Sequence, residues 1–193
     1  MTKNLSKFIT IALTVLVVAS TVGSTLTQAQ DARAKFEISG TSTVRGWTCL
    51  VDGVMDGTPG QSADPLPGFP SGLHSVTVTV QVQEFECPEE EMNEHLQDAM
   101  EASEHPEIVF ELQQYSMVGD TAEASGPITI HGVTKPITLE IELVESSDGV
   151  RGVGQAEINM TEFGVTPPSV FLGLLNVGEV VKIEFDAPLP SSE

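Results

Sequence analysis

The stretch GPITIHGVTKPITLEIEL, residues 126–143, decides the fold. After the polar link at residues 131–136, apolar side chains occupy every second position: Ile137, Leu139, Ile141 and Leu143. Side chains of a strand alternate between its two faces, so this pattern predicts a strand that is apolar on one face and polar on the other. Gly132 can supply positive φ in the link, and Pro136 removes a donor at a strand's first position, where that loss is tolerated.

The same alternation recurs along the chain. It is cleanest in residues 73–85, where Val76, Val78, Val80 and Val82 share one face. Further strands are predicted at residues 35–40, 44–55, 108–112, 122–130, 150–160 and 179–187, while the Gly/Pro-rich residues 56–72 predict a loop. Many short, evenly spaced strands predict a closed antiparallel β-barrel of about eight strands, with a sandwich as the alternative.

One helix interrupts the β pattern between Pro88 and Pro106. Acidic residues follow Pro88, where the helix dipole favours them, and Pro106 stops the helix. An apolar stripe recurs at helical spacing and is predicted to pack against the barrel: Met92, Leu96, Ala99 and Met100.

The first 29 residues have the features of a secretory signal peptide. Lys3 and Lys7 precede a charge-free apolar run, and small residues lead to a predicted cleavage after Ala29. A membrane anchor is the alternative, but the apolar centre is shorter than the roughly 20 residues that a span needs. We therefore expect export, and a single working domain at residues 30–193.

The formal net charge of −20 excludes one class of partner. A surface this acidic repels nucleic acid and anionic lipid headgroups. The sequence therefore predicts no nucleic-acid function. No other apolar run approaches spanning length, so no membrane span is predicted after signal removal.

The two cysteines, Cys49 and Cys87, have three interpretations. An even count in an exported protein favours a disulfide. Two buried free thiols are the second interpretation. A reactive or metal-binding pair is the third, although neither cysteine has a nearby His or second Cys at ligand spacing.

Several motifs resemble one family, the YceI-like proteins. Residues 126–136 resemble the family's G-x-L/I-T-I/L-H-G-V-T-K-P segment, residues 105–110 resemble its H-P-x-I-x-F helix end, and residues 161–165 resemble its F-G-I/V turn. Residues 93–96 depart from the family's usual helix, because no aromatic pair accompanies them. The resemblance implies a lipocalin-like barrel in the periplasm that binds a polyisoprenoid or a similar amphiphilic lipid.

A ligand of that kind requires an apolar lining. The candidate lining residues are Val76, Val78, Val80, Val82, Phe110, Leu112, Ile137, Leu139, Ile141, Leu143, Phe171 and Leu174. Phe171 and Leu174 belong to the greasy segment 165–178, which is either a plug over one barrel end or a ligand portal. The sequence leaves open a filled core, in which the same side chains only pack against one another.

Nothing in the sequence points to catalysis. There is no H-E-x-x-H, nucleophile elbow or phosphate loop, and the carboxylates do not stand out as a pair. His105 and His131 lie at junctions between predicted elements. There they are expected to hydrogen-bond to the backbone, and a ligand or metal contact is the alternative role. We therefore predict a protein that is not an enzyme and has no catalytic residues, no metal site and no cofactor beyond a bound lipid.

Two functions remain open. The first is an exported, non-catalytic carrier or buffer of an isoprenoid or similar amphiphile, with a homodimer as a possible assembly. The second is an exported stress-related or adhesive domain with a filled core, acting on a protein partner through its acidic surface. The interior of the barrel discriminates between them.

Overall fold

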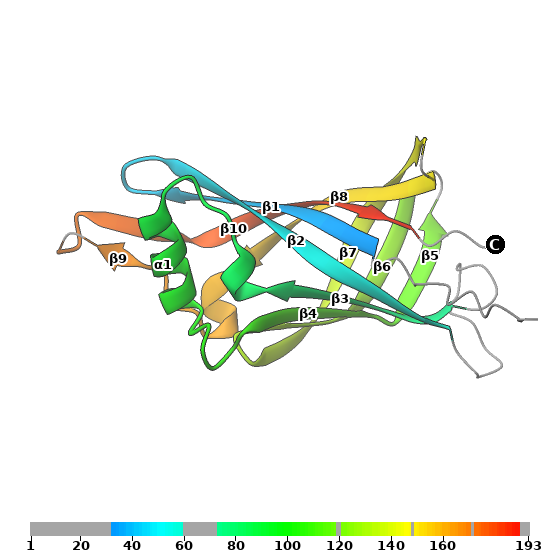
Figure 1. Ribbon diagram of the computed structural model, residues 1–193, viewed down its shortest axis with the longest axis horizontal. Helices are drawn as coiled ribbons and strands as arrows, with labels where there is room; N and C mark the ends of the chain where they lie inside the picture. The colour runs from blue at the N-terminus through cyan, green and yellow to red at the C-terminus, as the bar shows by residue number, and fades with distance from the viewer. Residues whose placement is uncertain (1–31, 60–72, 119–120, 148, 171, 190–193) are drawn as a thin grey trace, which may run out of the picture. The chain divides into compact units, whose positions relative to one another are not determined.

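The structure is a computed structural model that describes residues 32–59, 73–118, 121–147, 149–170 and 172–189 (Figure 1). The predicted signal segment lies outside these residues. Within them, no helix is long and apolar enough to cross a membrane.

The strands form one antiparallel sheet. Their bounds are β1 (Ala32–Ser42), β2 (Gly46–Pro59), β3 (Leu73–Gln81), β4 (Glu107–Leu112), β5 (Gln114–Val118), β6 (Thr121–Ile130), β7 (Val133–Ser146), β8 (Gly149–Asn159), β9 (Ser169–Val170) and β10 (Leu175–Pro188). The order is β1-β2-β3-β4-β6-β7-β8-β10, and β10 also pairs with β1. This last pairing closes an eight-strand antiparallel barrel and confirms the predicted fold class.

The closing pair is long and regular. Phe36 lies opposite Phe185, and Ile38 lies opposite Ile183. Because these pairs share one face at period 2, both strands direct apolar side chains to the same side of the sheet. The apolar face of every strand thus meets the others inside the barrel.

β4 and β5 act as one strand with a break at Gln113. β4 pairs with β6 at Phe110 opposite Ile128, and β5 resumes the pairing at Gln114 opposite Ser125. Gly126 lies where β6 passes from β5 to β4, and a Cβ atom there would lie 1.9 Å from the carbonyl oxygen of Glu111. Only glycine admits this approach of two backbones. The sequence did not predict β5, which is short and mostly exposed.

The fold-deciding stretch forms a hairpin of β6 and β7. β7 begins at Val133, three residues before Pro136, so the strand is longer than predicted. Pro136 lies opposite Pro127. Neither proline has an N–H, so the two strands offer no backbone donor at this pair.

Three short helices complete the described residues: η1 (Val82–Glu84), α1 (Glu90–Ala99) and η2 (Met160–Phe163). α1 lies at one end of the barrel (Figure 1). Its stripe packs as predicted, because Met92, Leu96 and Ala99 contact the main core cluster and Met100 is buried. The helix starts later than Pro88 and ends well before Pro106, with a turn in between.

The connection into α1 is tied to β2. Cys49 and Cys87 form a disulfide, which confirms the favoured interpretation of the two cysteines. Leu50 and Glu86 exchange two backbone hydrogen bonds of 2.9 and 2.7 Å. The Cys87 N–H also donates to the Asn93 side chain at 2.8 Å. These contacts fix the start of α1 over the barrel end.

Reduction of this disulfide should lower the stability of the fold. Closing a loop of 38 residues stabilises by about 3–4 kcal/mol in the chain-entropy model, which corresponds to a melting temperature shift of roughly 10 °C for a domain of this size. Calorimetry with and without reductant measures the shift. The matched control is the double variant Cys49→Ala/Cys87→Ala, which should melt at the lower temperature whether or not reductant is present. An equal melting temperature for the oxidised and reduced wild-type protein would contradict the expectation.

Candidate functional site: two apolar cavities

The first cavity lies inside the barrel and has a volume of about 160 Å³. This is far above the roughly 10–15 Å³ that one water-sized sphere needs. Its wall contains many of the predicted lining residues: Val76, Val78, Val80, Phe110, Leu112, Ile137, Leu139 and Ile141. The interior on this side is therefore hollow, although the ligand contacts themselves stay a prediction.

The opposite wall of the first cavity comes from strands that sequence reasoning did not assign to the lining. β1 contributes Phe36, and β10 contributes Ile183 and Phe185, with Ala156 and Ile158 from β8. The signal was present, because the apolar side chains of β10 recur at every second position. What the sequence lacked was the β1–β10 closure that turns this face inward.

A single hydroxyl interrupts the apolar wall among the described residues that line the first cavity. It belongs to Tyr115 on β5, whose side chain is buried. Burial raises the pKa of the Tyr115 phenol above its ordinary value of 10.0, because desolvation disfavours the phenolate. The hydroxyl also contacts the sulfur of Met117 at 3.8 Å. Tyr115 is thus the one residue with a polar side-chain group among the described residues that line the first cavity.

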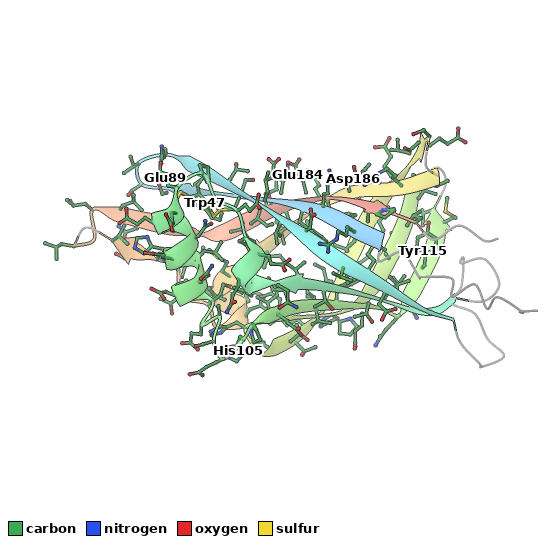
Figure 2. The ribbon with its side chains drawn as sticks, in the orientation of Figure 1. Trp47, Glu89, His105, Tyr115, Glu184 and Asp186 are labelled. Carbon is green, nitrogen blue, oxygen red and sulfur yellow. A yellow bond between two sulfur atoms is a disulfide. The ribbon has the colours of Figure 1, made fainter. Side chains whose placement is uncertain are left out.

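The second cavity is larger, with a volume of about 270 Å³, and lies at the α1 end. Trp47 lines it, and Figure 2 shows Trp47 and Tyr115 toward opposite ends of the barrel. α1 supplies part of the wall through Met92, Leu96 and Ala99. The apolar stripe of the helix therefore does more than fill the core, since it covers a hollow space.

Polar side chains gather on one side of the second cavity. Arg45, from the turn between β1 and β2, forms an ion pair with Glu89, the residue before α1. Both side chains are more than half exposed, so the pair adds little stability. Ser42, Glu91 and His95 also line this cavity. The second cavity thus combines an apolar interior with a polar border, as ligand sites commonly do.

The two cavities share part of their walls. The shared residues are Ile38, Phe85, Ile108, Ile158 and Ile183. All five are aliphatic or aromatic, so no polar side chain separates one hollow from the other. The interior thus contains two apolar compartments on either side of a shared wall, called here the waist, which these five residues form.

Four predicted lining residues need separate comment. Val82 does not lie in β3, because the strand ends at Gln81 and η1 turns this side chain into the packed core, where it is 0% exposed. Leu143 packs beside the smaller core cluster without lining the first cavity. Leu174 is 78% exposed, because the turn at Leu172 and Gly173 directs it outward. Phe171 lies outside the described residues.

Part of the segment 165–178 borders the second cavity. Val165 is buried in the main core, and Val170, Leu175 and Val177 line the cavity wall. This placement agrees with both earlier readings of the segment, since a plug and a portal would each lie here. The segment and α1 come from distant parts of the sequence and meet at this one hollow.

Comparison with known proteins places this architecture. The family model described as YceI-like domain matches residues 17–189. A UPF0312 protein from Pseudomonas aeruginosa strain LESB58 is 30% identical over 98 residues, which cover 47% of this chain and 51% of that protein. Protein YceI from Salmonella arizonae is 30% identical over 99 residues, covering 47% and 52%. The matched part spans about half the length of these curated relatives.

Solved structures share the fold. Burkholderia cenocepacia BcnA superimposes with a TM-score of 0.56 at 17% identity, covering 79% of this chain and 94% of that one. A polyisoprenoid binding domain from Saccharophagus degradans gives 0.54 at 12% identity, covering 81% and 91%. The Campylobacter jejuni YCEI protein gives 0.52 at 20% identity, covering 74% and 82%. These likenesses show the shared fold, and the family model's match over residues 17–189 shows that the chain belongs to the YceI-like family.

Proposed function

We propose that this protein binds a polyisoprenoid or similar amphiphilic lipid inside its barrel, as a non-catalytic carrier or buffer. The observation that carries the proposal is the pair of apolar compartments meeting at the waist. An apolar chain gains about 0.8 kcal/mol for each CH₂ group that it removes from water. A hollow wall of Val, Ile, Leu and Phe supplies that gain without directional chemistry.

The arrangement of polar groups supports an amphiphile over a purely apolar ligand. The tail would occupy the compartments, and the headgroup would lie at the polar border near Arg45 and His95 or at the Tyr115 hydroxyl. The family supports the same reading, since one structural neighbour is named a polyisoprenoid binding domain. The second function, a filled-core domain acting through its surface, loses the feature that would favour it, because the interior is hollow.

The site of action is part of the same proposal. The charge-free apolar run before Ala29 supports export, and the cysteine pair suits an oxidising compartment such as the periplasm. Organic extraction of the protein from its native host, followed by mass spectrometry, tests both the ligand and its class. A stoichiometric isoprenoid is expected. Protein that carries none, and takes up none after incubation with native lipids, would contradict the proposal.

Filling the first cavity should block uptake. Leu139→Trp adds a ring to the cavity wall, so uptake of the isoprenoid alcohol geranylgeraniol should fall by at least about tenfold, equivalent to 1.4 kcal/mol of binding free energy. Mass spectrometry of the extracted protein measures the bound alcohol. Leu143→Trp is the matched control, since Leu143 shares the same face of β7 but does not line the cavity. Equal loss in both variants, or full uptake by a folded Leu139→Trp protein, would show that this wall does not hold the ligand.

The chain's single tyrosine and single tryptophan report on the two compartments separately. The tyrosinate absorbance of Tyr115 should titrate with a midpoint above 10.0, and geranylgeraniol should raise that midpoint further by removing remaining water. Because folding raises the pKa of the Tyr115 phenol, the contribution of this group to the stability of the fold is complete at a pH below its unfolded-state pKa. The contribution is lost as the pH rises through the folded-state pKa. Trp47 fluorescence should change saturably as geranylgeraniol is added, if the second compartment fills.

Tyr115→Phe gives the control for this experiment, because it removes the absorbance signal and should leave the fluorescence change intact. A midpoint at or below 10.0 would contradict the burial of the phenol. A midpoint and a fluorescence spectrum that both ignore the alcohol would contradict binding in either compartment.

A further inference from the structure

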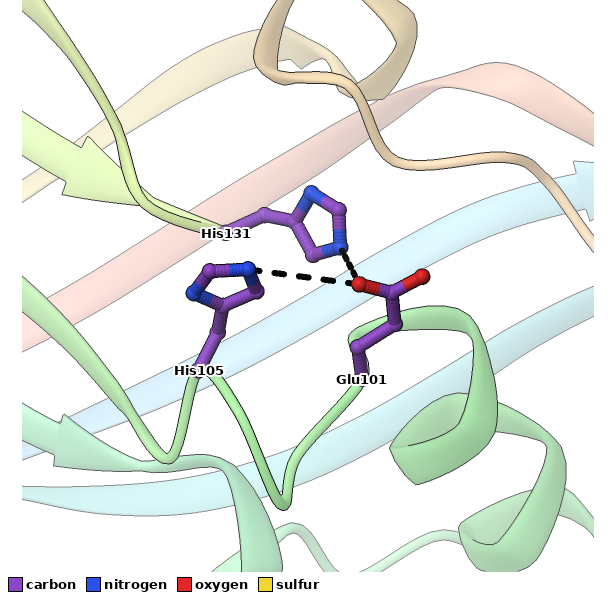
Figure 3. A group of neighbouring side chains, drawn as sticks. All are labelled: Glu101, His105 and His131. Atoms are coloured by element: carbon purple, nitrogen blue, oxygen red, sulfur yellow. Dashed lines mark ion pairs between the residues drawn. The ribbon is translucent and has the colours of Figure 1, made fainter.

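Three side chains that can bind metal meet outside both cavities. Glu101 follows α1, His105 precedes β4, and His131 lies in the turn between β6 and β7 (Figure 3). One ligand atom from each residue lies within 4.8 Å of the others. Nε2 of His131 is 3.2 Å from Oε2 of Glu101, and Nε2 of His105 is 4.0 Å from the same oxygen. The three side chains thus surround a common point.

The backbone accepts unusual conformations to bring these groups together. Glu101 has φ of 47° and His131 has φ of 49°, both in the left-handed region. Such a conformation costs about 1–2 kcal/mol for a residue other than glycine. His131 and Gly132 form the two-residue turn between Ile130 and Val133, where asparagine, aspartate or glycine is the usual first residue. Histidine adopts the left-handed region more readily than most residues, so the turn permits His131 without requiring it.

Gly132 makes room for the second imidazole. A Cβ atom at this position would lie 2.8 Å from Cε1 of His105. The absence of that atom lets the His105 ring lie against the turn, edge-on to His131 with ring centroids 4.5 Å apart. The two rings thus contact each other edge to face because the backbone positions them, and no hydrogen bond joins them among the described residues.

Among the described residues, Nε2 of His131 finds no hydrogen-bond partner. The atom is buried and makes no hydrogen bond of acceptable geometry among the described residues, although the Glu101 carboxylate is only 3.2 Å away. A buried polar atom without a partner costs about 1–3 kcal/mol. A metal ion bound between the nitrogen and the carboxylate would satisfy it.

The donor set selects the class of metal. Two imidazole nitrogens and one carboxylate oxygen match three-ligand zinc sites that leave a fourth position for water. Bonds of about 2.0–2.1 Å in a tetrahedron place ligand atoms roughly 3.3–3.4 Å apart, close to the 3.2 Å between His131 and Glu101. The other separations among the ligand atoms reach up to 4.8 Å and would have to shorten through rotation of the half-exposed Glu101 side chain and of the partly exposed His105 ring. Calcium and magnesium are disfavoured, because they require oxygen ligands.

We propose that Glu101, His105 and His131 form a binding site for a first-row transition metal ion, with Zn²⁺ as the best-fitting occupant. The ion would clamp the turn after α1 to the turn between β6 and β7, with water at the fourth position. The formal net charge of −20 would draw divalent cations toward the surface. None of the three residues lines either cavity, so the site is independent of the proposed lipid binding.

Titration calorimetry tests the site with ZnCl₂ and protein that carries no histidine tag and has been stripped with a chelator. One Zn²⁺ per chain is expected. His131→Gln and His105→Gln should each weaken binding at least about tenfold, the lower end of what even an indirect metal contact costs. The controls are His95→Gln, which changes a histidine of α1 outside the cluster, and Glu104→Gln, which changes a neighbouring carboxylate; both should bind Zn²⁺ like the wild type.

Absence of saturable Zn²⁺ binding by the wild-type protein would overturn the proposal, as would unchanged affinity in all three of His131→Gln, His105→Gln and Glu101→Gln. Cobalt(II) gives a measurement on the wild-type protein alone, in case a variant does not fold. The visible absorption of four-coordinate cobalt, lost on addition of Zn²⁺, is expected. A six-coordinate spectrum, as for the hydrated ion, would count against the site.

Discussion

The pairing of β1 with β10 is the interaction on which the rest of the structure depends. The two strands are the first and last of the described barrel, and their ladder runs from Lys35 opposite Asp186 to Gly40 opposite Val181 before a shift at Ser42. Closure removes the open edges that a sheet would otherwise present. Closure also turns the apolar face of every barrel strand toward the same interior. Without it, Phe36 and Phe185 would have no common space to border.

An interior that is hollow gives up packing contacts, since side chains along a void lack partner atoms on one side. The barrel offsets this loss with the hydrogen bonds between its strands and with covalent and backbone links at the α1 end. There the disulfide between Cys49 and Cys87 and the bridge between Leu50 and Glu86 hold the helix over the second compartment. The disulfide is itself part of this compartment's wall, because Cys49 and Cys87 both line it.

The two ends of the barrel are chemically different. The first compartment has the Tyr115 hydroxyl in an otherwise apolar wall, and the second has a border with Arg45, Glu89 and His95. The His105 and His131 cluster lies just beyond the helix, at the turn that follows it. A metal ion there would connect the segment leaving α1 to the β6–β7 hairpin, so that both ends of the helix segment would be attached to the barrel. Ligand binding and metal binding would then act on neighbouring parts of one cap without sharing a residue.

The sequence by itself determined the local structure. The alternation in residues 126–143 gave β7 and its inward face, and the apolar stripe of α1 gave the helix and its buried side, because each pattern repeats with the period of its own element. Local patterns failed where geometry changes within a few residues. Val82 leaves β3 through η1, and the turn at Gly173 exposes Leu174.

Only the tertiary structure decided what the interior and the turns contain. A filled core and a hollow one use the same apolar faces, so no periodicity distinguishes them; the separation of the walls, set by closure of the barrel, does. The same holds for Glu101, His105 and His131, which no sequence motif joins. The hairpin that carries His131 reaches the turn after α1 only because β4 and β6 are neighbours in the closed sheet. Distances between residues far apart in sequence are a property of the whole fold.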